Sequence, residues 1–155
     1  PPKTAARPLR TSPVDDAGFT LDERLERSSH LILRRGNIQV RLADDSRFPW
    51  LLLVPEQAQA SELHDLDKKL RCEILELATQ LGKVMKRIFE ADKINIAAIG
   101  NIVPQLHIHI VARRHDDDAW PAPIWGFGEP APLSEQLRFA RAEAISAAID
   151  QEVPT

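Results

Sequence analysis

The chain has 155 residues, of which 43% are hydrophobic and 28% charged, and its formal net charge is −3. This length and composition are typical of one compact soluble domain whose core is large enough to fold without disulfides or a structural metal. The near-neutral charge argues against general binding to nucleic acid or to an anionic membrane, and the single cysteine, Cys72, excludes an internal disulfide and CxxC-type zinc sites.

We expect residues 1–18 to form a flexible N-terminal arm, because the start of the chain has no apolar core like that of a signal peptide. Residues 19–155 would then form a single domain. No apolar run approaches the roughly 20 residues that span a membrane. Cys72 is expected to be a small buried hydrophobe on a helix, and the lack of a disulfide framework suits the reducing cytoplasm.

Hydrophobic periodicity predicts a helix, three strands, a long helix, two strands and a tail helix. In chain order these elements span about residues 19–25, 31–33, 38–42, 50–54, 65–91, 93–99, 106–113 and 133–149. Thr20 and Glu23 have the spacing of a capping box at the first helix, and Gly36-Asn37 is typical of a hairpin turn. The order predicts an α+β fold: an antiparallel sheet of about five strands, with the long helix packed on it and a C-terminal helix. Residues 113–155 are interpreted as a C-terminal loop and helix extension.

The long helix carries a single apolar stripe at the helical period. Its members are Leu66, Leu70, Ile74, Leu77, Leu81, Met85 and Ile88. The charged residues fall largely on the other side, so the stripe should pack on the sheet and the charged face should meet solvent. We therefore expect no chemistry from this helix.

The segment that can carry chemistry precedes and includes the last predicted strand. Side chains alternate between the faces of a strand, so Gln105, His107 and His109 should share one face, while the intervening apolar residues point into the core. A neutral imidazole can attack phosphorus, and a protonated one can hold phosphate oxygens or protonate a leaving group. The amide of Gln105 can donate a hydrogen bond but cannot carry a proton or a charge. We expect a hydrogen-bonded row of these three side chains at the edge of a cleft.

Polar residues near this row favour a phosphate site over a merely solvated sheet face. Gly100 and Asn101 lie just upstream and can offer backbone N–H groups to an anion, and Asn95 adds an amide on the neighbouring strand. The chain lacks the competing motifs GxGxxG, GxxxxGK[ST], GxSxG and HExxH.

The other histidines and the tryptophans are expected to have ordinary structural roles. Surface or capping positions are assigned to His30, His64 and His115. Packing or a dimer interface, rather than base stacking, is assigned to Trp50, Trp120 and Trp125.

The chain resembles the histidine-triad (HIT) superfamily, whose signature is His-φ-His-φ-His-φ-φ with φ apolar. Residues 105–111, Gln-Leu-His-Ile-His-Ile-Val, match this signature except at the first position, where glutamine replaces histidine. The strand that ends in Val54-Pro55 and the long helix before the motif are also similar to the family. Asn95, Gly100 and Asn101 stand where family members commonly carry Asn, Gly and Gln or Asn.

The resemblance implies a homodimer with a continuous sheet, an AMP-like ligand, and hydrolysis or transfer at the α-phosphate of an ester, a phosphoramidate or a dinucleoside polyphosphate. It implies that His107 is the nucleophile, that His109 contacts phosphate oxygens or the leaving group, and that Asn95 orients the site. Asp44 would hold the ribose hydroxyls, a role for which Asp45 is equally available. No cofactor is required, although a divalent cation could accompany the nucleotide.

Three hypotheses stay open at this point. The first is a hydrolase or nucleotidyl transferase of the histidine-triad type. The second is a nucleotide-binding regulator without turnover, because Gln105 cannot perform acid–base chemistry. The third is a metal protein in which His107 and His109 supply two ligands and a third comes from His64, His115 or residues 116–118.

Overall fold

The computed structural model describes residues 18–153 and forms one five-stranded antiparallel sheet in the order β1-β2-β3-β5-β4. The strands are β1 (Ser29–Arg35), β2 (Ile38–Ala43), β3 (Trp50–Pro55), β4 (Lys93–Ala97) and β5 (Ile108–Arg113). The helices are α1 (Glu23–Arg27), α2 (Lys68–Ile88) and α3 (Glu135–Glu152), with a 3-10 turn at Leu63–Asp65. This confirms the predicted α+β fold. The arm predicted at residues 1–18 lies, apart from Gly18, outside the described residues.

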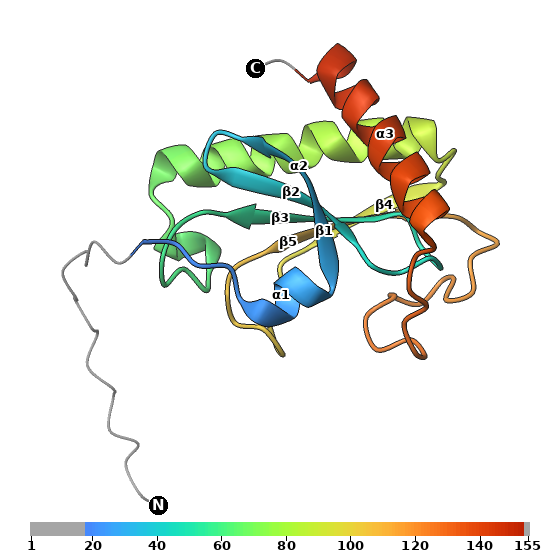
Figure 1. The fold of residues 1–155 in the computed structure, drawn as a ribbon, viewed down its shortest axis with the longest axis horizontal. Coiled ribbons are helices and arrows are strands. Elements are labelled where there is room, and N and C mark those ends of the chain that lie inside the picture. The colour runs from blue at the N-terminus through green and yellow to red at the C-terminus, as the bar shows by residue number, and fades with distance from the viewer. Residues whose placement is uncertain (1–17, 154–155) are drawn as a thin grey trace, which may run out of the picture.

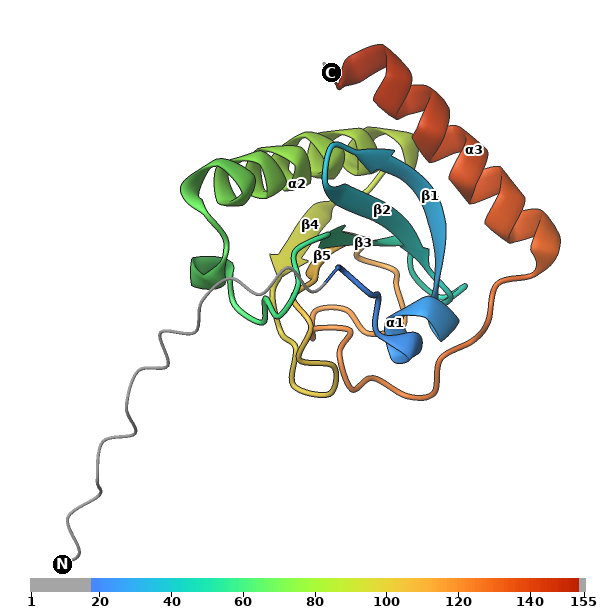
Figure 2. The same cartoon turned by 60° about the vertical axis from the view of Figure 1, so that its left-hand side comes forward.

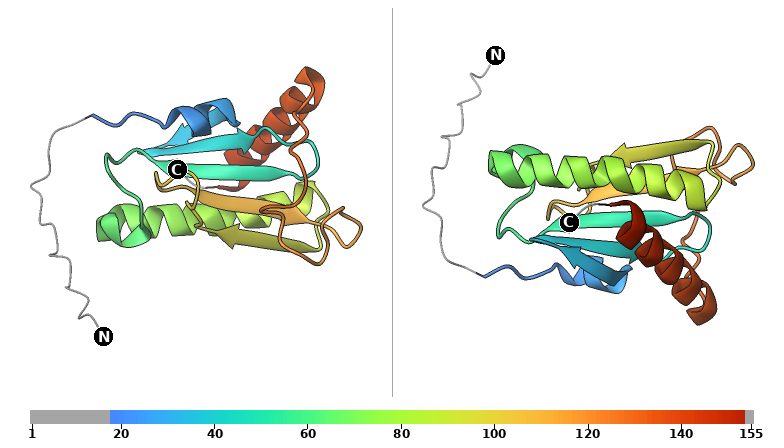
Figure 3. Two further views of the ribbon diagram at one scale, coloured as in Figure 1. Left: turned by 90° about the horizontal axis from the view of Figure 1, so that it is seen from below. Right: turned by 90° about the horizontal axis from the view of Figure 1, so that it is seen from above.

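The long helix α2 covers one face of the sheet, as its apolar stripe predicts (Figure 1). Its buried residues pack with residues of the central strands that point to the same side, such as Val40, Leu51 and Ile108. The helix α3 lies beside α2 and adds Ile145 and Ile149 to this core (Figure 3). None of the helices within residues 18–153 is long and apolar enough to cross a membrane.

Two separate segments cover the opposite face of the sheet. Figure 2 shows α1 on the side of the sheet away from α2. There Leu25 of α1 is buried against Leu52 and Val54 of β3. Beside it, the loop between β5 and α3 packs Ala119 and Ile124 against the sheet. This face therefore has two covers. The N-terminal cover is α1, and the C-terminal cover is the loop between β5 and α3.

The helix ends differ from the prediction for local reasons. Helix α1 begins after Asp22, whose side chain accepts a hydrogen bond from the Arg24 amide, so the predicted cap at Thr20 is wrong. Helix α2 is shorter than predicted, because Asp67 caps its start and Glu90 has a positive φ of 48° just beyond its end.

Cys72 is exposed on α2, which corrects the expectation that it is buried. It lies two residues after the buried Leu70. Two residues along an α-helix turn the side chain about 200° away. The thiol therefore falls on the solvent side.

Candidate functional site

Two histidine rings lie together on the sheet face away from α2. His109 is on β5, opposite Leu52 of β3 and Ala97 of β4, and His107 directly precedes the strand. The two ring centroids are 4.7 Å apart, and the residues are only 6% and 7% exposed. The alternate residues, Leu106, Ile108 and Ile110, belong to the core beneath α2. The predicted division between the two faces is therefore what the structure shows.

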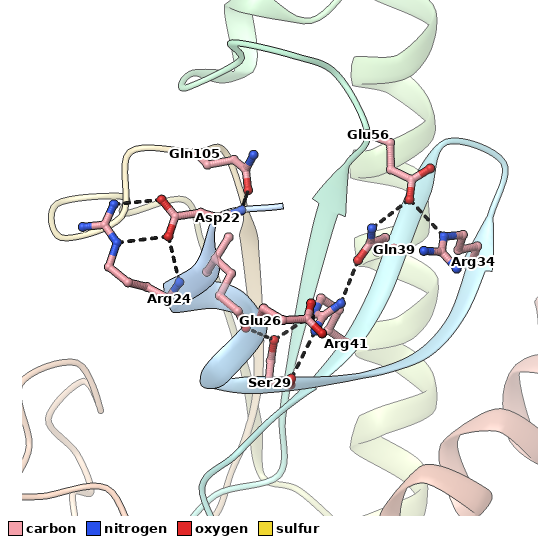
Figure 4. Close-up of polar contacts among 10 residues, drawn as sticks. Asp22, Arg24, Glu26, Ser29, Arg34, Gln39, Arg41, Glu56 and Gln105 are labelled. Atoms are coloured by element: carbon pink, nitrogen blue, oxygen red, sulfur yellow. Dashed lines mark hydrogen bonds and ion pairs between the residues drawn. The ribbon is translucent and has the colours of Figure 1, made fainter. Parts of the chain in front are cut away.

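The side chain of Gln105 is not hydrogen-bonded to either ring, so the predicted row of three side chains is wrong at this position. Its Oε1 accepts a hydrogen bond from the Asp22 amide at 2.9 Å (Figure 4). Its Nε2 donates one to the Thr20 carbonyl at 2.9 Å. Gln105 precedes the first paired residue of β5, Ile108, so no strand pairing fixes its side chain on the histidine face. The amide instead ties the segment before α1 to the histidine strand.

Arg24 provides a second tie between the same two segments. Its Nη1 donates to the Ile102 carbonyl at 2.9 Å, and its Nη2 lies 2.8 Å from Asp22 Oδ2 (Figure 4). The hydrogen bonds from Arg24 lower the pKa of the Asp22 carboxyl to about 2. Asp22 is therefore ionised at neutral pH, and it is the charged neighbour of the His107 ring.

The main chain fixes the state of the His107 ring. His107 Nδ1 lies 2.7 Å from the carbonyl oxygen of Gln105. Burial lowers the pKa of His107, while this hydrogen bond and the charge of Asp22 act in the opposite direction. The net direction is downward, so the ring is uncharged at neutral pH.

Aromatic residues enclose the His109 ring. Trp50 Nε1 donates a hydrogen bond to His109 Nδ1 at 3.0 Å, and the Trp125 ring lies 5.3 Å from the His109 ring between centroids. Burial, followed by the neighbouring His107, lowers the pKa of His109 to about 3. Among the described residues, Trp125 Nε1 is the one buried side-chain nitrogen or oxygen without a hydrogen-bond partner.

The contact between Trp50 and His109 was not predicted, because the tryptophans were expected to serve packing or a dimer interface. The available signal is strand register, since Trp50 pairs with Val111, two residues beyond His109, and therefore shares its face. The register between β3 and β5 is a long-range property that the local pattern does not contain.

The predicted nucleotide-binding residues are partly engaged elsewhere. Asn95 Oδ1 accepts a hydrogen bond from Arg113 Nη1 at 2.9 Å, so Asn95 supports a buried arginine rather than a histidine. Asp117 holds the same arginine through an ion pair of 2.7 Å. Gly100 has a φ of 66° in the loop between β4 and β5, and Asn101 beside it is exposed.

The predicted ribose carboxylates have structural partners. Asp44 Oδ1 accepts a hydrogen bond from the Leu133 amide at 2.9 Å and so anchors the segment before α3. Asp45 is buried and pairs with Arg47 at 2.7 Å. Both contacts are to groups outside the histidine pair, so they give the ribose assignment no support.

A metal site at the histidine pair lacks its third ligand. Within residues 18–153 there is no group of three or more His, Cys, Asp or Glu side chains that could hold a metal ion. His64 lies beside Asp65, and His115 lies beside Asp92 and against the ring of Trp120. The hypothesis that these residues complete a site with the pair is therefore wrong.

Two hollows on this side of the molecule lie beside the histidine pair rather than over it. One of about 510 Å³ is lined by residues 20–24, Arg27 and Gln105. Another of about 500 Å³ lies over Gln39, Arg41 and Glu56. Neither is lined by His107 or His109, so neither supports the predicted position of the pair at the edge of a cleft.

The polar residues that line the second hollow are hydrogen-bonded to one another (Figure 4). Arg41 donates to Ser29 Oγ and to Gln39 Oε1, each at 2.8 Å, and pairs with Glu26 at 3.0 Å. Gln39 in turn donates to Glu56. Because the buried guanidinium already has partners, this network stabilises the junction of α1 with the sheet and is not assigned a ligand.

Comparison with known proteins gives consistent matches. The family model described as the HIT domain matches residues 24–116. A histidine triad protein from Sinorhizobium meliloti is 42% identical, with a TM-score of 0.82 over 84% of this chain and 96% of that one. Histidine triad proteins from Bradyrhizobium japonicum (36% identity, TM-score 0.83, 85% and 98%) and Marinobacter aquaeolei (33%, 0.85, 88% and 100%) are similar. No curated protein matches the chain.

Proposed function

The chain belongs to the HIT domain family, and from this premise we propose that it binds a nucleoside phosphate and hydrolyses or transfers it at the α-phosphorus. An AMP-like nucleotide is the proposed ligand, and a divalent cation could arrive on its phosphates. A structural neighbour from Sulfolobus tokodaii, 14% identical, is itself described as a histidine triad nucleotide-binding protein. The observation that carries the proposal is the hydrogen bond between His107 and the main chain of Gln105.

This hydrogen bond prepares His107 as a nucleophile. A carbonyl oxygen can only accept, so His107 Nδ1 carries the hydrogen and Nε2 keeps its lone pair. Burial keeps the ring uncharged at neutral pH. A neutral imidazole with a free Nε2 is competent to attack phosphorus.

The proposed reaction has two displacements at the same phosphorus. His107 Nε2 forms a bond to the α-phosphorus, and the leaving group departs with the electron pair of the broken bond. Water or an acceptor hydroxyl then breaks the P–N bond, and its proton passes to solvent. The His109 ring lies 4.7 Å from that of His107 and is available to donate a hydrogen bond to a phosphate oxygen.

The test is the substitution His107→Ala, assayed with a dinucleoside polyphosphate and with an adenosine phosphoramidate. We expect the wild type to turn over at least one of them and to form a nucleotidylated protein, seen by mass spectrometry after an alkaline quench. His107→Ala should show neither turnover nor adduct while it keeps the fold.

The control is His115→Ala, which removes a histidine that lies beside Asp92 and against Trp120, outside the pair. It should keep both turnover and adduct. Equal rates in the wild type and His107→Ala would remove the covalent mechanism. A wild type that binds AMP without turning over either substrate would favour the binding-only regulator.

The free edge of the sheet supports a homodimer. β4 pairs only with β5 among the described strands, so one side of β4 offers its backbone to a second chain. Apolar side chains are exposed along this edge, with Ile96 at 46% and Leu75 of α2 at 42%. We propose that two copies pair through β4 and continue the sheet.

A further inference from the structure

Trp50 determines where the His109 ring can carry a hydrogen. The indole N–H is a donor only, and it is directed at His109 Nδ1 from 3.0 Å. Nδ1 must therefore be the unprotonated nitrogen, and the neutral ring carries its hydrogen at Nε2. A second proton on Nδ1 would place two N–H groups against each other, so protonation requires this hydrogen bond to break.

Within residues 18–153, none of the elements around His109 offers a charge that would compensate for protonation. Strand β3 contributes Trp50 and Leu52, β4 contributes Ala97, and the loop before α3 contributes the Trp125 ring. Among the described residues, the titratable neighbour that acts on His109 is His107, and it disfavours a second positive charge. The ionised Asp22 acts on His107 instead.

Resting on the proposed function, we propose that Trp50 is a positioning residue that holds His109 as a neutral Nε2–H donor. The site therefore favours substrates whose leaving group departs as a stable anion, such as a nucleoside polyphosphate, over substrates whose leaving group is an amine.

The preference follows from the proton balance of the first displacement. When the bond from phosphorus to a bridging phosphate oxygen breaks, the leaving polyphosphate keeps the electron pair as a stable anion and needs no proton. When the bond from phosphorus to an amine nitrogen breaks, the nitrogen must gain a proton as it leaves. A neutral His109 cannot supply one without becoming an imidazolate, Gln105 is an amide, and Asp22 is ionised. Only solvent would remain as the acid.

The first experiment measures the protonation state directly, by ¹⁵N NMR of the histidine side chains in the intact protein. We expect wild-type His109 to show an unprotonated Nδ1 and a protonated Nε2, unchanged between about pH 8 and pH 5, the range in which an ordinary histidine titrates. A protonated Nδ1 in the wild type would overturn the proposal, and this result needs no variant.

Two matched variants then separate the hydrogen bond from packing. Trp50→Phe keeps an aromatic ring but removes the N–H, so His109 should populate both neutral tautomers and begin to titrate at higher pH. Trp125→Phe alters the other aromatic neighbour, whose Nε1 has no partner in the structure, and should leave the His109 spectrum as in the wild type. An unchanged spectrum in Trp50→Phe, or an equal change in Trp125→Phe, would contradict the assignment.

The second experiment compares diadenosine polyphosphate with adenosine 5′-phosphoramidate, which share the transferred nucleotidyl group. We expect wild-type kcat/KM at neutral pH to be higher for the polyphosphate by at least about 10²-fold, the usual worth of one acid–base group. In Trp50→Phe the ratio should shrink as the pH is lowered and His109 takes a proton. Equal wild-type rates would overturn the substrate preference. If neither substrate reacts, the proposed function and the preference both fail, whereas the NMR result on Trp50 stands by itself.

Discussion

At the scale of single residues, burial of uncharged histidines couples the stability of the protein to pH. The pKa of His109 is about 3 in the folded chain, against an ordinary 6.5. Between these two pH values His109 binds a proton in the unfolded chain but not in the folded chain. The stabilisation is therefore complete above about pH 6.5 and is lost as the pH falls towards 3.

We predict that His109→Gln flattens this acid dependence. The free energy of unfolding of the wild type should fall by on the order of a few kcal/mol from about pH 7 to about pH 4, and the variant should fall by less. Urea denaturation at both pH values measures it. The control His64→Gln, at a histidine whose side chain is 82% exposed, should keep the wild-type slope. Equal slopes in the wild type and His109→Gln would show that His109 titrates normally.

The Gln105 side chain holds the segment before α1 through two hydrogen bonds and does not take the place of a catalytic histidine. We predict that Gln105→His and Gln105→Ala both speed hydrogen exchange at the Asp22 amide, because each removes the Oε1 acceptor of that N–H. The loss of two hydrogen bonds should cost about 1–3 kcal/mol of stability. Neither variant should raise turnover.

Gln80→Ala is the control, because Gln80 is a half-buried residue of α2 whose side chain donates a hydrogen bond to Glu76 of the same helix. It should leave exchange at Asp22 unchanged. Faster turnover in Gln105→His, with normal exchange at Asp22, would instead place position 105 in the chemistry.

At the scale of elements, the support of the site depends on α2, the helix beneath the histidine strand. Asp67 caps its first turn by accepting a hydrogen bond from the Leu70 amide at 2.8 Å. We predict that Asp67→Ala lowers the free energy of unfolding by about 1 kcal/mol. Asp150→Ala, at an exposed position of α3, should change it by less than about 0.5 kcal/mol. Similar losses of unfolding free energy in the two variants would show that the Asp67 cap does not stabilise α2.

The elements themselves could be predicted from the sequence because their signals are local. The stripe of α2 and the alternation around Ile108 each lie within a few residues of chain, and both predicted the correct face. Helix ends were less certain, since several nearby side chains can cap. Thr20 and Asp22 can both cap a helix, and in the structure Asp22 accepts the hydrogen bond from the Arg24 amide.

The contacts of the site could not be predicted because they join distant segments. Trp50 meets His109 through the pairing of β3 with β5, and Asp44 meets Leu133 across 89 residues of chain. Gln105 also bonds to a segment 83 residues earlier. In each case the sequence shows that the residue is polar or aromatic. Its partner depends on the strand register and on how the two segments that cover the sheet pack against it.

At the scale of the whole molecule, we expect a homodimer because β4 is an exposed edge of the sheet. β4 carries Ile94 and Ile96 beside Gly82 of α2, and the absence of a side chain on Gly82 lets the helix approach Ile94 closely. Beyond the strand, Ile102 is 83% exposed. An unpaired strand edge flanked by apolar side chains is a surface that a second copy can bury.

We predict that the wild type sediments at twice the chain mass of 17.4 kDa at micromolar concentration, and that Ile96→Lys sediments at the single-chain mass. The lysine would bring a charge into the centre of the paired edge, where it has no acidic partner at hand, and its cost should exceed what the remaining apolar contacts supply. Phe139→Lys is the matched control. Phe139 is 67% exposed on α3, and this helix contacts β1, the strand at the opposite edge of the sheet from β4. This variant should keep the double mass. A wild type that sediments only at the single-chain mass would remove the dimer, and loss of the dimer in Phe139→Lys but not in Ile96→Lys would move the interface from β4 to α3.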